Sequence, residues 1–343
     1  MAYTTINKSS EHMTASIWTG NGTKITTGFS PDWIWFKARN AVSYAGILNA
    51  ITGYDKYVQS FSTDAETTST GMMVTDSTGY TPGSVLSSNS YVGWSWKANG
   101  TGSANTDGSI SSTVSANTTS GFSIVKYVGT GSGSNSTVGH GLGVTPSIIL
   151  VKSLDSVTDW VVWHKDLPSQ TNNYLRLNTN QAIGTTTNYW NSYAPTNQVF
   201  GVSPDGYNNN KSGEDTVAYC FSDVKGFSKM GSYTGNGSND GSFCFTGMKP
   251  SFVMIKRTDS TASWLMFDNK RANPFNEITA DLRADSSQAE DASTSYNNID
   301  FLSNGFKIRK SNADINGYGA TYIYMAFAEA PLVGTNNVPC TAR

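Results

Sequence analysis

The segment PDWIWFK at residues 31–37 recurs as PSIILVK at residues 146–152 and as PSFVMIK at residues 250–256. Each copy consists of a proline, a small polar residue, four apolar residues and a lysine. The copies are about 100 to 115 residues apart, which is the size of one antiparallel β-sandwich. Such a period indicates tandem copies of one structural unit, so the sequence predicts three equivalent domains.

Other sequence landmarks keep the same order around each copy of the repeated segment. An aromatic residue and a Gly-x-Gly turn lie upstream of each copy, and an aromatic-rich run closes each unit. Agreement between separate landmarks favours a duplication over a chance match. The upstream landmarks are residues 18–22, 127–131 and 233–237, and the closing runs are residues 92–96, 217–221 and 323–327.

The repeated segments are expected to form β-strands. Four apolar residues between a proline and a lysine are too few for a helix, and their Trp, Ile, Val and Phe content fits a strand that is buried on both faces. A proline at the first position of a strand costs no ladder hydrogen bond. The sequence therefore predicts an all-β fold of three tandem antiparallel β-sandwich units, of jelly-roll or lectin-like type.

Composition places the boundaries between these units. Residues 101–120 are rich in Gly, Ser, Thr, Asn and Ala, and this polar composition predicts a linker or an extended crossover. The first unit should then hinge freely, whereas the second and third should form a rigid pair because only residues 222–226 separate them. The predicted parts are a first unit at 1–100, the linker at 101–120, units at 121–224 and 225–335, and a C-terminal tail at 336–343.

Charge and cysteine content argue against several classes of protein. Charged residues are 14% of the chain and the net charge is −2, so no strong positive field attracts phosphates and nucleic acid is not an expected partner. Cys220, Cys244 and Cys340 lack the spacing of a disulfide framework or a zinc site. No apolar run approaches the ~20 residues of a membrane span, so membrane insertion is not expected.

Paired carboxylates are the first candidates for catalysis. Acid–base hydrolysis needs two carboxylates that face one cleft, with pKa values shifted apart. Acidic residues are densest in the third unit, where we expect a solvated loop rather than a catalytic pair. This acidic group comprises Glu277, Asp281, Asp285, Glu290 and Asp291.

Histidine offers no better nucleophile system or metal site. The chain holds only His12, His140 and His164. No two His or Cys residues stand at ligand spacing and no G-x-S-x-G motif occurs, so the favoured interpretation is that His164 lies at the surface. We predict no catalytic residue, no metal site and no cofactor.

The lysines that end the repeated segments are Lys37, Lys152 and Lys256. A lysine after a buried strand usually marks the point where the chain emerges into water, and it protects the strand edge. We expect the three lysines to be exposed in this way. A row of basic contact residues is the alternative.

An aromatic loop in the second unit is the one candidate binding site. Residues 188–193 read NYWNSY, in which Tyr189, Trp190 and Tyr193 alternate with amides. Aromatic rings can cover the faces of sugars while amides bond their hydroxyl groups, so we predict a glycan site at these three residues. The competing interpretation, which we favour for Trp190, is that this ring fills the bottom of its own sandwich.

The chain resembles a family of virion structural proteins from marine tailed bacteriophages. The resemblance runs from end to end, through MAYTTINKS at 1–9, VGWSWKANG at 92–100, FLSNGFK at 301–307 and ATYIYMAFAE at 320–329. It implies a component of a phage particle, assembled in the host cytoplasm, and it implies no catalytic residues. Other virion proteins of the tail or capsid are the implied partners.

The resemblance and the predicted fold lead to one functional expectation with two alternatives. We expect a non-enzymatic tail fibre or receptor-binding component that attaches to a host surface glycan. A capsid decoration or head-fibre protein is the first alternative, and a polysaccharide-degrading tailspike is the second. A homo-oligomer is expected, with a trimer favoured because virion parts occupy symmetric positions.

Overall fold

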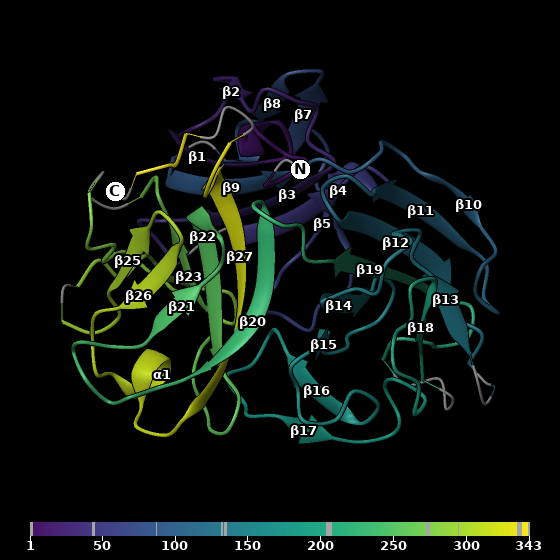
Figure 1. Ribbon diagram of the computed structural model, residues 1–343. Helices are drawn as coiled ribbons and strands as arrows, with labels where there is room; N and C mark the ends of the chain where they lie inside the picture. The colour runs from purple at the N-terminus through teal and green to yellow at the C-terminus, as the bar shows by residue number, and fades with distance from the viewer. Residues whose placement is uncertain are drawn as a thin grey trace.

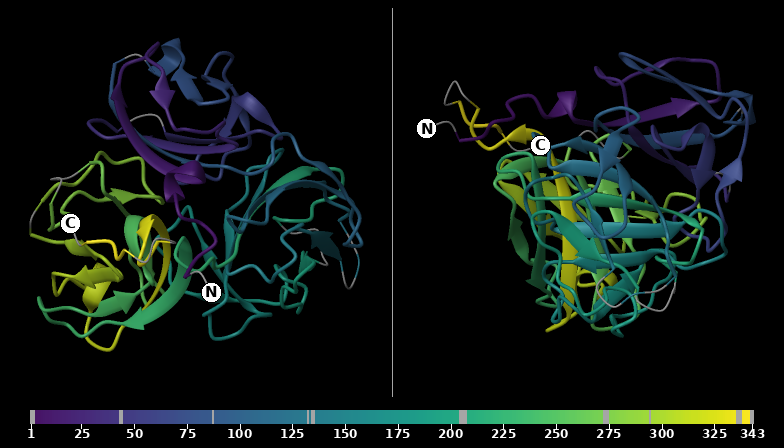
Figure 2. Two further views of the ribbon diagram at one scale, coloured as in Figure 1. Left: turned by 45° about the horizontal axis from the view of Figure 1, so that its top comes forward. Right: turned by 90° about the vertical axis from the view of Figure 1, so that its right-hand side faces the viewer.

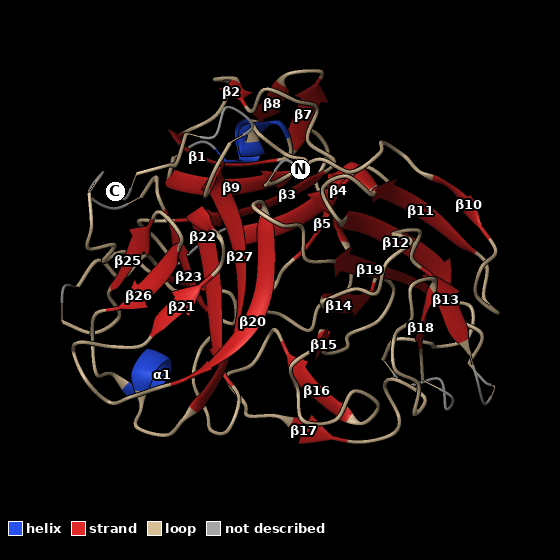
Figure 3. Cartoon of the chain, viewed as in Figure 1, coloured by secondary structure: helices blue, strands red, loops and turns tan. Residues whose placement is uncertain are grey.

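The computed structural model describes residues 3–42, 45–86, 88–131, 133, 136–203, 208–271, 275–293, 295–334 and 338–341. The described chain is built of strands and turns, as Figure 3 shows. Its helical segments are short: η1 (Ser9–Glu11), η2 (Ser84–Leu86) and α1 (Ala313–Asn316). All described strand pairs within the sheets are antiparallel, so the predicted all-β sandwich class is confirmed.

The first large sheet holds the first copy of the repeated segment in its middle (Figure 1). A small sheet covers its outer face, and the two layers enclose Ile34, Phe36 and Tyr80. The large sheet has the order β1 (Met13–Thr19), β9 (Ser90–Trp96), β3 (Trp33–Ala38), β4 (Ala45–Asn49), β5 (Gly53–Val58) and β6 (Thr67–Thr68). The small sheet has the order β2 (Ile25–Thr26), β8 (Gly79–Pro82) and β7 (Met73–Asp76).

The second large sheet repeats this plan and extends it at one edge. Its outer face packs on a two-stranded sheet around Val138, Ile149 and Phe200. The large sheet has the order β10 (Ser103–Asn105), β11 (Ser112–Asn117), β12 (Phe122–Val128), β19 (Asp215–Phe221), β14 (Ile148–Ser153), β15 (Val161–His164), β16 (Asn173–Arg176) and β17 (Gly184–Thr185). The small sheet pairs β13 (Thr137–Gly139) with β18 (Val199–Gly201).

The third large sheet again carries the repeated segment between the closing strand and the strand that follows the segment. Its outer residues Val253 and Ile255 belong to one cluster with Phe306 of the third small sheet. The large sheet has the order β20 (Ser228–Thr234), β27 (Thr321–Pro331), β22 (Met248–Arg257), β23 (Leu265–Asp268) and β24 (Leu282–Arg283). The small sheet has the order β21 (Phe243–Phe245), β26 (Gly305–Ile308) and β25 (Ile299–Leu302).

The three repeated segments occupy equivalent places in the three sheets. Each pairs in the same register with the closing run of its own unit, as in Trp33 with Trp96, Ile148 with Phe221 and Phe252 with Phe327. Figure 2 shows three lobes arranged around one axis, coloured purple, teal and green to yellow. The threefold repeat of the sequence is therefore also a repeat of strand order.

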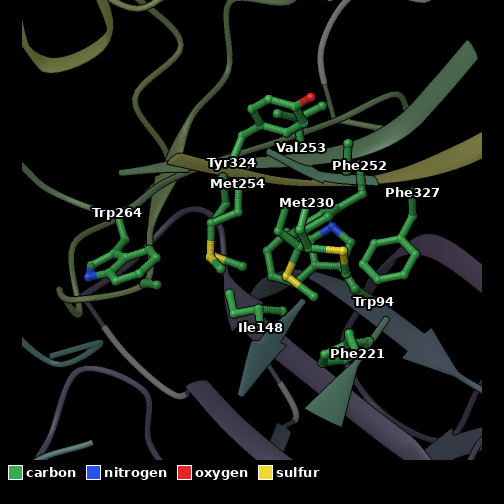
Figure 4. Close-up of a cluster of buried hydrophobic side chains, with 14 of the residues drawn as sticks. Trp94, Ile148, Phe221, Met230, Phe252, Val253, Met254, Trp264, Tyr324 and Phe327 are labelled. Atoms are coloured by element: carbon green, nitrogen blue, oxygen red, sulfur yellow. The ribbon is translucent and has the colours of Figure 1, made fainter. Parts of the chain in front are cut away.

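The inner faces of the large sheets meet in one shared core. Trp96 of the first sheet, Phe221 of the second and Phe327 of the third contact one another. Their ring centroids are 5.3 Å apart for Trp96 and Phe327, 5.6 Å for Phe221 and Phe327, and 6.1 Å for Trp96 and Phe221. Figure 4 shows side chains from all three sheets converging there. These residues belong to one continuous cluster of buried side chains, so the three lobes share a central core, while the first and second sandwiches also enclose separate clusters between their own two layers. The division into three domains stays a prediction.

Residues 101–120 are not a linker, so this prediction was wrong. They contain β10 and β11, and β11 pairs with β12 from Phe122 to Tyr127. Ile110 and Val114 enter the core of the second sandwich. Ser and Thr side chains tolerate an extended strand well, and an available strand edge supplies the hydrogen bonds that composition alone does not reveal. The expected free hinge of the first unit is wrong for the same reason, because that unit shares the central core.

The predicted C-terminal tail lies only partly in the described structure. Residues 336, 337, 342 and 343 of the tail lie outside the described residues. Within the described part, Val333 and Pro339 form an isolated antiparallel bridge. The N-terminal segment contacts the same lobe, because the Tyr3 hydroxyl donates to the Gly247 carbonyl at 2.8 Å.

Candidate functional site

The predicted glycan site does not form a ring platform. Tyr189 and Trp190 are buried in the core of the second sandwich, with 3% and 0% of their surface exposed. The Trp190 indole donates to the Asn173 carbonyl at 3.0 Å. Stacking needs an exposed ring face, so the prediction was wrong for these two residues, and the alternative that Trp190 fills its own sandwich is confirmed.

The local backbone explains why the aromatic loop turns inward. Asn191 and Ser192 have φ values of 54° and 53°, so the chain reverses directly after Trp190. The Tyr193 N–H donates to the Trp190 carbonyl at 2.8 Å and closes this turn. Tyr193 is half-buried and keeps part of its surface accessible, so its role in glycan binding stays a prediction.

The three repeated lysines are buried, which corrects the prediction that they emerge into water. Lys37 and Lys152 each have 1% of their surface exposed and Lys256 has 0%. Each donates from Nζ to a backbone carbonyl of a neighbouring sandwich. The contacts are Lys37 to Ser286 at 2.6 Å, Lys152 to Thr63 at 3.2 Å and Lys256 to Asn180 at 3.1 Å.

These junction lysines (Lys37, Lys152 and Lys256) link the sandwiches in a ring. The lysine of the first sandwich donates a hydrogen bond to the third sandwich, that of the second donates to the first, and that of the third donates to the second. Burial lowers the pKa of each amine to about 8. Two indoles link the same pairs of sandwiches: Trp160 donates to the Gln59 carbonyl, and Trp264 donates to the Arg176 carbonyl. The repeated segment thus carries the connection between lobes as well as a strand of each lobe.

One member of the acidic group, Asp281, is buried, so the solvated-loop prediction was wrong for that residue, whereas Asp285 is half-buried. Burial raises the pKa of both carboxyls, that of Asp281 to about 6. Asp281 accepts from Asn297 Nδ2 at 3.0 Å, whereas Asp285 accepts from the Trp264 N–H at 2.9 Å. The two carboxylates have different partners, and neither lines the groove described below.

A buried ion-pair network joins the first and third sandwiches beside this acidic group. The Arg271 side chain is fully buried and contacts both Asp268 and Glu290. Glu290 also pairs with Arg39 of the first sandwich, with Nε and Oε2 3.0 Å apart. The Trp94 indole donates to Asp268 at 3.0 Å from the other side. These ion pairs neutralise the buried charges between the first and third sandwiches, so the network has a structural role.

His140 and His164 are fully buried, so the prediction of a surface His164 was wrong. Burial lowers the pKa of both imidazoles, that of His164 to about 4. His164 Nδ1 accepts the Asp166 N–H at 3.1 Å and His140 Nδ1 accepts the Leu142 N–H at 3.2 Å. Among the described residues, no three His, Cys, Asp or Glu side chains are grouped so that they could hold a metal ion.

A groove lies along β1, at the edge of the first large sheet. Its volume is about 540 Å³, and a smaller cavity of about 70 Å³ that shares Thr14, Ala15 and Lys270 continues it toward the third sandwich. One wall is β1 and the opposite wall is β2 with the residues before it. Ile17 is 48% exposed at this edge. The groove therefore combines an open strand edge with an accessible apolar side chain.

Lysines supply the positive charge at the groove. Lys24 pairs with Asp76 at 2.6 Å and thereby holds the pKa of that carboxyl at about 2. Lys270 is exposed and makes no ion pair within the described part of the chain. Sequence reasoning missed this groove because nothing in a single strand shows which edge its neighbours leave open. The one usable signal was that residues 101–120, interpreted as a linker, precede the second copy and have no counterpart in the short connection before the third.

Comparisons with known proteins identify a family for the chain, but no relative whose role is known. No curated protein and no solved structure matches the chain. None of the helices in the described ranges has the length and apolar character required to cross a membrane. One family, described as a domain of unknown function, DUF7483, matches residues 8–331. Because this match covers nearly the whole sequence, the chain belongs to the DUF7483 family.

Proposed function

We propose that the protein is a non-enzymatic structural component of a tailed-bacteriophage particle, and that it acts as a tail fibre or receptor-binding component. The observation that carries the proposal is the shared core, in which Trp96, Phe221 and Phe327 join three sandwiches. A particle component must keep its fold outside a cell without chaperones. Lobes that share one core are expected to unfold together and so to meet this requirement, which supports the role implied by the sequence resemblance.

Host attachment through a glycan would use exposed rings rather than the buried aromatic loop. Tyr318 is 90% exposed and Tyr296 is 56% exposed, and Tyr193 retains some accessible surface. A glycan array with the purified protein tests this role. We expect binding that falls at least about tenfold in Tyr318→Ala or Tyr193→Ala, because ring stacking on a sugar face is lost. Binding to no host glycan would contradict the receptor-binding role.

A capsid decoration or head-fibre protein is the second candidate function. Burial of Tyr189 and Trp190 favours it, because the ring platform expected for glycan recognition is absent from the loop that suggested it. In either role, partners are other virion proteins and the protein forms a homo-oligomer, with a trimer favoured.

Labelling of intact particles separates the two roles. Antibodies raised against the purified protein are applied to phage particles and viewed by electron microscopy, with particles that lack the protein as the control. We expect label at the tail for an attachment component and at the head for a decoration protein. Absence of the protein from purified particles would contradict the virion proposal itself.

A further inference from the structure

One side of the first sandwich is open in both of its layers. In the described structure, β1 pairs only with β9, and β2 pairs only with β8. The groove of about 540 Å³ lies between these two strand edges. An unpaired edge presents a row of backbone donors and acceptors that another strand can use.

The register of β1 identifies which backbone groups face the groove. The Lys97 N–H donates to the His12 carbonyl at 2.9 Å, and the Gly20 N–H donates to the Asn89 carbonyl at 3.0 Å. In an antiparallel ladder the residues bonded to one neighbour alternate with those that point away from it. The N–H and C=O groups of Ala15, Ile17 and Thr19 therefore point away from β9 toward the open edge.

The second sandwich shows what closes the same side of this fold. There β11 pairs with β12, so that Ser115 lies opposite Ile124 and Thr113 opposite Lys126. The preceding residue Ile110 bridges to Val138 of the small sheet. One extended segment thus covers the edges of both layers.

The covered and open edges correspond residue by residue. Trp18 and Tyr127 both precede a Gly-x-Gly turn. The first glycine of each turn donates its N–H to the carbonyl of the residue directly before the closing strand, which is Asn89 before β9 and Glu214 before β19. This alignment places Ile17 at the position of Lys126, which β11 covers in the second sandwich. The edge of β1 is therefore the uncovered equivalent of an edge that takes an added strand.

We infer that the edge of β1 binds an extended, acidic peptide segment of another protein, which adds to the first large sheet as an antiparallel strand. Strand addition gives affinity through main-chain hydrogen bonds, here to Ala15 and Ile17. Lys270 lines the groove and pairs with no carboxylate within the described residues. Its positive charge therefore favours a binding segment that carries acidic side chains. A second copy fits less well, since pairing two identical edges brings lysines of the same charge to one interface.

The test uses a peptide of the strand that covers the equivalent edge. The probe is residues 110–118, ISSTVSANT, with a glutamate added at each end, and the same peptide without glutamates is the comparison. Titration into the full chain is followed by fluorescence anisotropy. We expect saturable binding of the acidic peptide, at least about fivefold tighter than that of the neutral one, with slower amide exchange at Ala15 and Ile17.

Two variants place the binding at this edge. Ile17→Pro removes an N–H that points into the groove and leaves the β9 ladder intact, so binding is lost while the melting temperature changes little. Lys270→Glu reverses the charge at the groove, and it lowers affinity at least about fivefold without touching the strand, which keeps the test valid if Ile17→Pro fails to fold. Lys126→Pro is the matched control at the covered edge, where loss of the N–H should destabilise the fold.

Three results would overturn the inference. The first is absence of saturable binding of the acidic peptide up to about 1 mM. The second is binding that neither Ile17→Pro nor Lys270→Glu weakens. The third is self-association of the wild-type chain that is lost in the folded Ile17→Pro variant, because this would make a second copy the occupant of the edge.

Discussion

At the scale of single residues, lysine shows how far context changes a side chain's role. An isolated Lys after a strand is usually exposed, yet Lys37, Lys152 and Lys256 are buried because neighbouring lobes offer carbonyl oxygens to their amines. No property of the repeated segment itself reveals those carbonyls, since they come from residues far away in the sequence. The burial of Trp190, by contrast, follows the general tendency of large rings, and the competing interpretation of the sequence anticipated it.

Replacing a junction lysine should destabilise the whole protein. Lys152 donates to the carbonyls of Thr63, Ser153 and Ser156, and Lys152→Met leaves these buried acceptors without their donor. We expect a loss of about 2 to 4 kcal/mol of unfolding free energy, measured by chemical denaturation. Lys126→Met, at a partly exposed lysine that pairs with Asp215, should cost less than about 1 kcal/mol. Equal effects of the two variants would contradict the junction role.

The junction lysines also predict a pH dependence of stability. Their pKa values are about 8 in the folded chain against 10.5 for the ordinary amine, so above pH 8 the unfolded chain binds more protons than the folded one. Stability should therefore rise between pH 8 and 9, by up to about 1 kcal/mol per lysine. Above this range ionisation of the buried thiols Cys220 and Cys244, whose pKa values are raised, opposes the rise. Denaturation at several pH values measures the slope, and Lys152→Met should reduce it; a fall in stability over this window would contradict the assignment.

Removal of the buried indole at Trp190 distinguishes packing from ligand binding. Trp190→Ala should lower the unfolding free energy by about 3 to 5 kcal/mol, because it leaves a cavity in the core of the second sandwich. Tyr318→Ala, at a ring that is 90% exposed, should change stability by less than about 0.5 kcal/mol. Thermal and chemical unfolding of both variants check this contrast. A Trp190→Ala variant as stable as the wild type would show that the ring is not part of the core.

At the scale of secondary-structure elements, strands are recognised from the sequence more readily than their partners. The run from Trp33 to Phe36 reads as a buried strand because apolar residues fill it between a proline and a lysine, and β3 occupies this place. Residues 101–120 read as a linker because Ser and Thr serve in loops and strands alike. Pairing with the edge of β12, which follows after the turn at residues 118–121, makes β11 a strand. The same reasoning explains why the groove at β1 was not anticipated.

Proline substitution tests whether residues 101–120 are a strand or a linker. The Thr113 N–H faces Lys126 in the β11–β12 ladder, so Thr113→Pro removes a ladder bond. We expect it to cost about 1 to 3 kcal/mol of stability. Thr106→Pro lies in the same segment, outside any strand and exposed, and should be nearly neutral. If both variants were equally stable, the segment would behave as a linker in solution.

At the scale of the whole molecule, one core joins three lobes that the repeat alone would make independent. Tandem copies predict separate sandwiches, and the strand order inside each lobe agrees with this expectation. The contact between lobes could not be predicted because both faces of each repeated strand are apolar, which is equally consistent with one lobe or with a packed trio. The ring of Phe221, close to Phe327 and Trp96, belongs to all three lobes at once.

Cooperative unfolding of the full chain tests the shared core most directly. Differential scanning calorimetry of the wild-type protein should give a single endotherm whose calorimetric and van't Hoff enthalpies agree, because no lobe can lose its inner face without exposing those of the others. The Phe221→Ala variant should shift that single transition downward as one unit. Two or more separate transitions, or a transition in which Phe221→Ala moves only one component, would contradict the account.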